Sequence, residues 1–409
     1  MLTPLFLIEK NHVSYLVELP EFAPGFNATE QMGMLAAQTD WQAVLEFLTQ
    51  YSDNKNTLAS YTREVEKFLL WLIHIAQKPI SAVNRQDWQH FLAFLTSPNP
   101  DWAGPRTPRT IDGKPNPNWR PFCERFEAEP LAKTMNTDAG SFRNALSATS
   151  IKLTQKILES FFNFLVENGY LNANPCTVSR SRRKLALPAH SVLDRAIDIE
   201  LVDEVIDSLY AKQSRTTNKG AQFQLIRARY LIQLLAGTGL RLEEACNHCF
   251  GDIRIVKDEW ILSIVGKGSK PRQIVIFSDL KALICEYRLA IGLTSPTPLY
   301  GEKHVLIPSM RDLTKPLTPR RVDQIMREIF DDFAKEKLYQ AQQAHDMQDK
   351  GALLHQVSIL EKASPHWLRH LHATYYLKHS GDLKSTMDRL GHASVGTSML
   401  YIHNKQSLD

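Results

Sequence analysis

Apolar side chains recur at three- and four-residue steps in three segments of the first half of the chain. These segments are residues 57–76, 81–95 and 150–170. Such a period is typical of an amphipathic helix with one buried face. Thr57 can cap the first helix, and Gly169 follows the third, where helices often end. We therefore expect a small helical domain over residues 39–175.

The second half of the chain, residues 191–409, also has mainly helical periodicity, with one β-prone island. Residues 252–277 contain three apolar runs that are separated by "KDE" and "GKGSKP". Short β-prone runs with turn residues between them predict a three-stranded antiparallel sheet. Thr318 and Pro319 are a typical N-cap and first residue for the next helix. The expected fold class is mainly α with a small antiparallel β-sheet.

Several segments interrupt this periodicity. Residues 1–38 have short apolar runs broken by prolines and are interpreted as an N-terminal arm without an assigned structure. Residues 97–121 are rich in proline and predict a mobile surface loop, with a DNA-contacting loop as the alternative. Residues 334–363 are polar and helix-prone, which favours a projecting helical hairpin or one long helix.

Residues 176–190 are a candidate interdomain linker with a concentrated positive charge. No acidic residue accompanies the four cations in "SRSRRK", which are Arg180, Arg182, Arg183 and Lys184. A solvated linker needs no further function. An extended cationic strap across a DNA phosphate backbone explains the same residues equally well.

Composition narrows the class of protein. A length of 409 residues suggests two domains, and 43% hydrophobic with 22% charged residues is ordinary for a globular protein. A net charge of +4 permits a nucleic-acid partner without requiring one. We find no apolar run of membrane-spanning length and no secretion signal, so we expect no membrane partner. Five cysteines without a disulfide rhythm suit a reducing cytoplasm.

The stretch "CNHC" resembles half of a zinc site. Cys246, His248 and Cys249 would need further ligands, and the chain has no second Cys/His pair of suitable spacing. We interpret the cysteines as two partly buried thiols on a helix. The pair His366 and His370 has the i, i+4 spacing of a metal site but lacks the glutamate of the zinc-protease motif. No metal and no cofactor are therefore expected.

Five short stretches of the second half carry residues suited to phosphodiester chemistry. Arg241 begins a helix with Glu244 one turn later, and Lys267 lies in a Gly-rich turn. Ser364 and Pro365 predict a helix start that puts His366 and Arg369 on one face. His392 follows Gly391, and Tyr401 comes nine residues after His392. Each stretch alone is as easily explained by packing or by a surface ion pair.

Taken in order, these residues resemble the signature of the tyrosine recombinases, the phage-integrase family. The resemblance covers about residues 195–403, and residues 39–175 resemble the core-binding domain of that family. It implies that Arg241 and Arg369 are the two catalytic arginines, Lys267 the hairpin lysine, His366 and His392 the two histidines, and Tyr401 the nucleophile. Glu244 would orient these groups without touching DNA.

The resemblance implies a site-specific recombinase that breaks and rejoins DNA through a 3′-phosphotyrosyl link, without ATP or a metal. The implied partners are double-stranded DNA, further copies of the chain in a tetramer on DNA, and accessory DNA-bending or directionality factors. The implied location is the cytoplasm, with the nucleoid as the DNA-bound location. A type IB topoisomerase, a catalytically silent DNA-binding regulator and a metal-dependent hydrolase are the alternatives. Only eight residues follow Tyr401, which departs from family members with a longer C-terminal helix.

Overall fold

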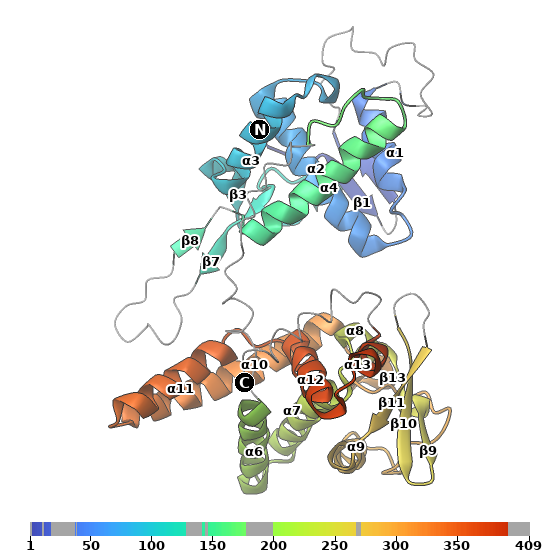
Figure 1. The fold of residues 1–409 in the computed structure, drawn as a ribbon, viewed down its shortest axis with the longest axis vertical. Helices are drawn as coiled ribbons and strands as arrows, with labels where there is room; N and C mark the ends of the chain where they lie inside the picture. The colour runs from blue at the N-terminus through green and yellow to red at the C-terminus, as the bar shows by residue number, and fades with distance from the viewer. Residues whose placement is uncertain are drawn as a thin grey trace. The chain divides into compact units, whose positions relative to one another are not determined.

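A computed structural model of the chain describes residues 2–9, 12–17, 37, 39–127, 141–143, 146–176, 199–266 and 271–391. Contacts divide these residues into an N-terminal unit that ends at residue 176 and a C-terminal unit that begins at residue 199. Each unit has its own apolar core. Figure 1 shows the helices and strands of both.

The described residues of the N-terminal unit contain four α-helices. They are α1 (Asp40–Thr49), α2 (Lys55–Trp71, continued by a π-helical turn over Leu72–Ala76), α3 (Arg85–Thr96) and α4 (Ala148–Glu167). The cap of α2 is Asn54, whose side chain accepts from the backbone N–H of Thr57, so the prediction of Thr57 as the cap is wrong. Helix α4 ends before Gly169, which has a positive φ of 75° and so suits the end of a helix.

Short strands complete the N-terminal unit. They are β1 (Phe6–Glu9), β2 (His12–Tyr15), β3 (Ala103–Gly104), β4 (Thr110–Ile111), β5 (Lys114–Pro115), β6 (Phe122–Cys123), β7 (Arg125–Glu127) and β8 (Ser141–Arg143). Strands β1 and β2 pair antiparallel, and Leu5, Phe6 and Val13 are buried in the helical core. The described parts of the expected N-terminal arm therefore pack with the helices.

Residues 97–121 are anchored to this core. Trp102 and Trp119 are buried, and the Arg109 guanidinium pairs with the buried carboxylate of Glu66 on α2. The prediction of a mobile surface loop is wrong here, because the two indoles supply apolar surface that a proline-rich composition concealed.

The C-terminal unit combines helices with a small sheet. Its elements are α6 (Ile199–Arg215), α7 (Lys219–Thr238), α8 (Leu242–Asn247), β9 (Ile253–Val256), β10 (Glu259–Val265), β11 (Pro271–Ile276), α9 (Ser278–Ala290), β12 (Pro308–Ser309), β13 (Asp312–Pro316), α10 (Pro319–Gln343), α11 (Met347–Leu360), α12 (Pro365–Ser380) and α13 (Leu383–Leu390). Strands β9, β10 and β11 form one antiparallel sheet in that order. The prediction of a three-stranded antiparallel sheet is confirmed.

Helices α10 and α11 form a hairpin, as Figure 1 shows. The predicted start of α10 is confirmed, since Thr318 accepts from the backbone N–H of Arg321 and Pro319 is the first residue. The polar face of α10 is tied to α6 through Lys337, which pairs with Glu204, and through Glu336, which pairs with Lys212. These two ion pairs fix the C-terminal half of α10, and with it the hairpin, to α6.

Candidate active site

The first catalytic candidate, Arg241, follows a sharp turn between α7 and α8. Gly239 adopts a φ of 64°, and a Cβ at this position would lie 2.5 Å from Cδ2 of His372. Only glycine combines that backbone conformation with that close approach. Arg241 is the N-cap of α8, and Glu244 accepts from its backbone N–H at 2.8 Å and from its Nη1 at 3.1 Å. The turn thus places the guanidinium and the carboxylate side by side.

The second candidate arginine comes from α12. Ser364 is the N-cap and Pro365 the first residue, as expected, but the Ser364 side chain makes no capping hydrogen bond. Arg369 is only 3% exposed and donates from Nη1 to the carbonyl of Gly239 at 2.6 Å and from Nη2 to the carbonyl of Leu390 at 2.5 Å. Its Nη1 also lies 3.8 Å from Oε2 of Glu244. The two predicted arginines therefore meet at one carboxylate.

A third arginine, Arg272 on β11, completes this cluster. It donates from Nη1 to Oε1 of Glu244 at 3.1 Å and from Nη2 to Oε2 at 2.7 Å. Burial alone would raise the pKa of Glu244, but hydrogen bonds from Arg272 and from the Arg241 backbone, together with both positive charges, hold it below its usual value. Glu244 is thus a carboxylate at neutral pH. Three guanidinium groups around one carboxylate leave a net positive charge, which favours an anionic ligand.

His366 lies in the first turn of α12, beside the two predicted arginines. Partial burial of the ring, then the charges of Arg369 and Arg241, lower the pKa of His366 below its usual value. A neutral imidazole can accept a proton at neutral pH. Its ring meets that of His370 edge-on, with centroids 4.3 Å apart.

Arg241, His366 and Arg369 line one pocket of about 370 Å³. Ser364 and the acidic residues Glu243 and Asp323 also line it. The pocket therefore brings together three of the six predicted catalytic residues.

The other three, Lys267, His392 and Tyr401, lie outside the described residues, as do the linker cations Arg180, Arg182, Arg183 and Lys184. Two described residues close to these positions in sequence, Arg272 and Gly391, contact the arginine cluster. Residues 267–270 connect β10 to β11, the strand that carries Arg272. Gly391, the residue before His392, ends α13 with a φ of 63°, and its carbonyl lies 3.5 Å from Nη2 of Arg241.

Sequence reasoning missed three buried residues that support this site. Arg272 is one of them. The other two, His372 and Arg389, bond to each other, and the Arg389 carbonyl accepts from Arg272. Arg389 donates from Nε to Nε2 of His372 at 3.0 Å, and its guanidinium stacks on Tyr376 at 4.8 Å. Nδ1 of His372 bonds the carbonyl of Ala236 at 2.7 Å. No local signal marks these residues, because each acts through partners that are distant in sequence.

The described residues contain no group of three or more His, Cys, Asp or Glu side chains that could hold a metal ion. In the "CNHC" stretch, Nδ1 of His248 instead bonds Asp252 at 2.9 Å. Cys246 lies on α8 and is buried, whereas Cys249 follows the end of that helix, so the prediction of two thiols on one helix is half wrong. In the part of the chain that the structure describes, no helix has the length and apolar character to cross a membrane.

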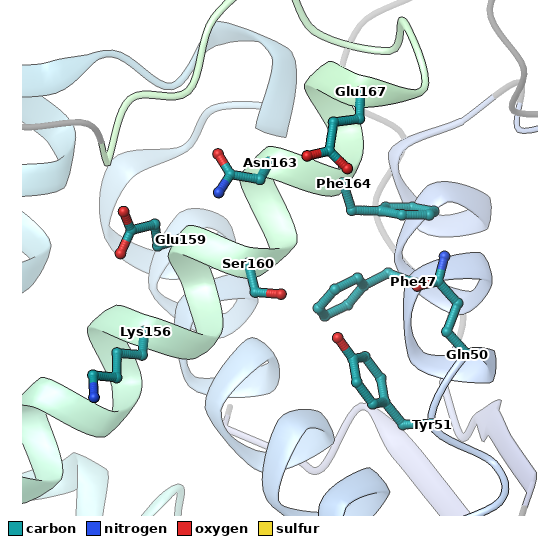
Figure 2. A pocket seen from close by; sticks show the side chains of 9 residues that line it. All are labelled: Phe47, Gln50, Tyr51, Lys156, Glu159, Ser160, Asn163, Phe164 and Glu167. Atoms are coloured by element: carbon teal, nitrogen blue, oxygen red, sulfur yellow. The ribbon is translucent and has the colours of Figure 1, made fainter. Parts of the chain in front are cut away.

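A second hollow, of about 350 Å³, lies between α1 and α4 of the N-terminal unit (Figure 2). Its apolar wall consists of Phe47, Tyr51 and Phe164. Its charged lining consists of two carboxylates, Glu159 and Glu167, and one lysine, Lys156, all on α4. An excess of negative charge opposes the binding of a phosphodiester, so this hollow is a poor candidate for the active site.

Residues 201–407 match the model of the phage integrase family. The chain belongs to this family. It is 24% identical over 340 residues to tyrosine recombinase XerC of Xanthomonas axonopodis pv. citri (strain 306), covering 83% of this chain and 91% of that protein. It is 26% identical over 294 residues to tyrosine recombinase XerC of Vibrio vulnificus (strain YJ016), covering 69% and 77%.

Solved structures agree on the fold. A post-cleavage complex of the site-specific recombinase XerH bound to palindromic difH substrate aligns over 91% of this chain and 83% of its own, with a TM-score of 0.56 and 17% identity. The Tn1549 transposon integrase in complex with circular intermediate DNA aligns over 91% and 100%, with a TM-score of 0.54 and 13% identity. The predicted fold class and the prediction of a tyrosine-type site-specific DNA recombinase are confirmed. The roles of single residues and the domain boundaries stay predictions.

Proposed function

We propose that this recombinase breaks and rejoins double-stranded DNA with Tyr401 as nucleophile, through a 3′-phosphotyrosyl link. The observation that carries this assignment is the shared pocket of Arg241, His366 and Arg369, with Gly391 beside Arg241. His392 is the next residue in sequence after Gly391, and Tyr401 follows nine residues later.

The two arginines bind the phosphate that Tyr401 attacks. Its non-bridging oxygens gain negative charge in the transition state, and planar guanidinium groups suit that charge. Arg369 is held by the carbonyls of Gly239 and Leu390, so its orientation is set before DNA binds. Arg241 is partly exposed at the pocket and reaches the phosphate from the other helix.

Protons move through three further residues. A phenol has a pKa near 10, so Tyr401 needs a base, and in this scheme His366, whose pKa is lowered by burial and the two arginines, accepts its proton. Lys267 donates a proton to the departing 5′ oxygen, and His392 adds a hydrogen bond to the phosphate. Glu244 keeps the arginines in place. The phosphotyrosyl link conserves the energy of the broken bond, so this scheme requires no ATP and no metal.

The test is the exchange Tyr401→Phe, which removes only the nucleophilic hydroxyl. The substrate is a duplex that carries the half-site selected by the wild-type protein from a random-sequence library. The wild type should form a covalent DNA adduct in EDTA, and the variant should bind the duplex equally well without forming one. An adduct that persists in the variant would remove Tyr401 from its role.

A topoisomerase is distinguished by the substrate. A type IB topoisomerase would relax closed-circular DNA that lacks the selected site, whereas a site-specific recombinase should leave that DNA supercoiled. Relaxation at equal rates with and without the site would favour the topoisomerase.

The linker cations Arg180, Arg182, Arg183 and Lys184 are proposed to contact the phosphate backbone. Their joint replacement by glutamine should weaken DNA binding and lower the slope of log affinity against log salt by about one unit per lost contact. An unchanged slope would identify the segment as a solvated linker.

Assembly into a tetramer on DNA is proposed to use the α10–α11 hairpin. Two large apolar side chains on it, Tyr339 and Met347, are 64% and 79% exposed. Replacing both by serine should leave binding to one site intact and abolish the pairing of two sites in a gel-shift assay. Unaltered pairing would direct attention to the segment before residue 39.

A further inference from the structure

Arg272 contacts three segments whose relative positions matter for the proposed mechanism. It is the second residue of β11 and follows the connection that contains Lys267. Its Nη1 and Nη2 hold both oxygens of Glu244 in a bidentate pair. Its Nε donates to the carbonyl of Arg389 at 3.0 Å, near the C-terminal end of α13. One side chain therefore links the hairpin, the arginine cluster and the exit toward Tyr401.

We propose that Arg272 is a positioning residue for DNA cleavage, which holds Glu244 against Arg241 and fixes the end of α13 from which His392 and Tyr401 follow. This inference rests on the proposed function. Arg272 is not among the described residues that line the pocket, and its side chain is only 8% exposed. It therefore acts through its neighbours and not on the phosphate itself.

The geometry at Gly391 supports this role. A Cβ at Gly391 would lie 3.1 Å from Nη1 of Arg272, so the guanidinium packs directly under the last described residue of the chain. Movement of the Arg272 guanidinium would therefore displace both Glu244 and the turn that leads to His392.

A lysine at position 272 cannot reproduce these contacts. An ammonium is a point charge and does not present the planar fork that spans both oxygens of Glu244 while Nε reaches a carbonyl on another segment. A lysine would, however, still balance the buried charge of Glu244. The pair Arg272→Lys and Arg272→Gln therefore separates positioning from simple charge neutralisation.

The experiment uses the full chain and a nicked duplex that carries the half-site selected by the wild-type protein from a random library. Single-turnover cleavage is measured at saturating protein, together with duplex affinity and thermal unfolding. Arg254→Gln is the matched control, because Arg254 is an exposed arginine on the same sheet that contacts Tyr300.

Both Arg272 variants should cleave about 100-fold more slowly than the wild type, since a displacement of about 1 Å at a reacting group costs that much. Their affinity for the duplex should change less than about threefold, and Arg254→Gln should match the wild type in every measurement. The pattern of a lost rate at full occupancy is the signature of positioning, which a purely structural residue would not give.

Three results would overturn the inference. One is cleavage by Arg272→Lys within about threefold of the wild type, which would leave charge balance as the only role. The second is near-normal cleavage by Arg272→Gln, and the third is failure of both variants to fold, which would make Arg272 purely structural. If the wild-type chain itself forms no adduct, the proposed function fails and the inference fails with it, whereas a normal wild-type adduct confines any failure to Arg272.

Discussion

The N-terminal and C-terminal units each bury a glutamate beside an arginine, yet the two clusters serve different ends. In the N-terminal unit Glu66 on α2 is 1% exposed and accepts from the backbone N–H groups of Leu5 at 2.8 Å and of Phe6 at 3.3 Å. Arg109 pairs with the same carboxylate and donates to the carbonyl of Phe6 at 3.1 Å. This cluster joins three distant parts of the chain into one core.

Glu244 in the C-terminal unit has the opposite balance of charge. Complete burial raises the pKa of Glu66 despite its one arginine, whereas Arg272 and Arg241 hold the pKa of Glu244 below its usual value. One arginine beside one carboxylate gives a cluster with no net charge. Three arginines around one carboxylate give a cluster with a net positive charge that can bind an anionic ligand. The comparison teaches that a surplus of arginine, and not the burial of an ion pair, distinguishes the site from the scaffold.

The strongest test of this difference replaces arginine by lysine in the surplus cluster. Arg241→Lys and Arg369→Lys should each slow cleavage by at least about 10³-fold, because an ammonium cannot stabilise the transition-state oxygens in a bidentate manner. The measurement is single-turnover adduct formation at saturating protein. Near-normal rates in both variants would assign these arginines to the scaffold.

The reverse expectation holds for the N-terminal cluster. Arg109→Ala leaves the carboxylate of Glu66 buried without a counter-charge, which should cost about 3 kcal/mol of unfolding free energy. Urea denaturation of the N-terminal transition measures this loss. The folded fraction should cleave DNA at the wild-type rate, and a loss of cleavage without a loss of stability would contradict the division between the clusters.

The two clusters also differ in how far the sequence could predict them. Arg241, His366 and Arg369 could be predicted because their residue types and order resemble the tyrosine-recombinase signature, and local helix starts place them. Three β-prone runs separated by turn residues likewise predicted the three-stranded sheet, since both signals are local.

The Glu66–Arg109 pair and the contact of Arg272 with Glu244 could not be predicted in this way. Their partners lie 43 and 28 positions apart in sequence, and no periodic pattern relates them. The anchored state of residues 97–121 was missed for the same reason. Long-range polar pairing depends on the finished fold, so composition and spacing do not reveal it.

The buried pair of Arg389 and His372 should make the stability of the C-terminal unit depend on pH. Burial, with the charges of Arg389 and Arg369, lowers the pKa of His372 from 6.5 to about 4. The unfolded chain therefore binds a proton more readily than the folded chain between these values. Stability should fall by about 2 kcal/mol when the pH is lowered from 7 to 5 and should be restored as the pH rises.

His372→Gln is the control for this prediction, because its amide oxygen can still accept from Arg389 but does not titrate. Denaturant unfolding measures the free energy of unfolding at pH 7 and at pH 5. The loss of this free energy between pH 7 and pH 5 should be smaller in the variant than in the wild type. An equal difference in both proteins would place the pH dependence elsewhere.

The smallest effect is expected for Glu66→Gln, the near-isosteric removal of charge from the N-terminal cluster. Because burial already disfavours the charged form of Glu66, a neutral amide oxygen can accept from Leu5 and Phe6 at little cost. Arg109 keeps its bond to the Phe6 carbonyl and its stacking on Trp119, where it lies 5.0 Å from the ring centroid. We expect a loss of about 1 kcal/mol in unfolding free energy and no change in cleavage rate.

The matched exchange Glu244→Gln should instead slow cleavage by about tenfold or more, because three guanidinium groups lose their shared counter-charge. Equal effects of the two exchanges on stability and on cleavage would mean that both glutamates belong to the scaffold.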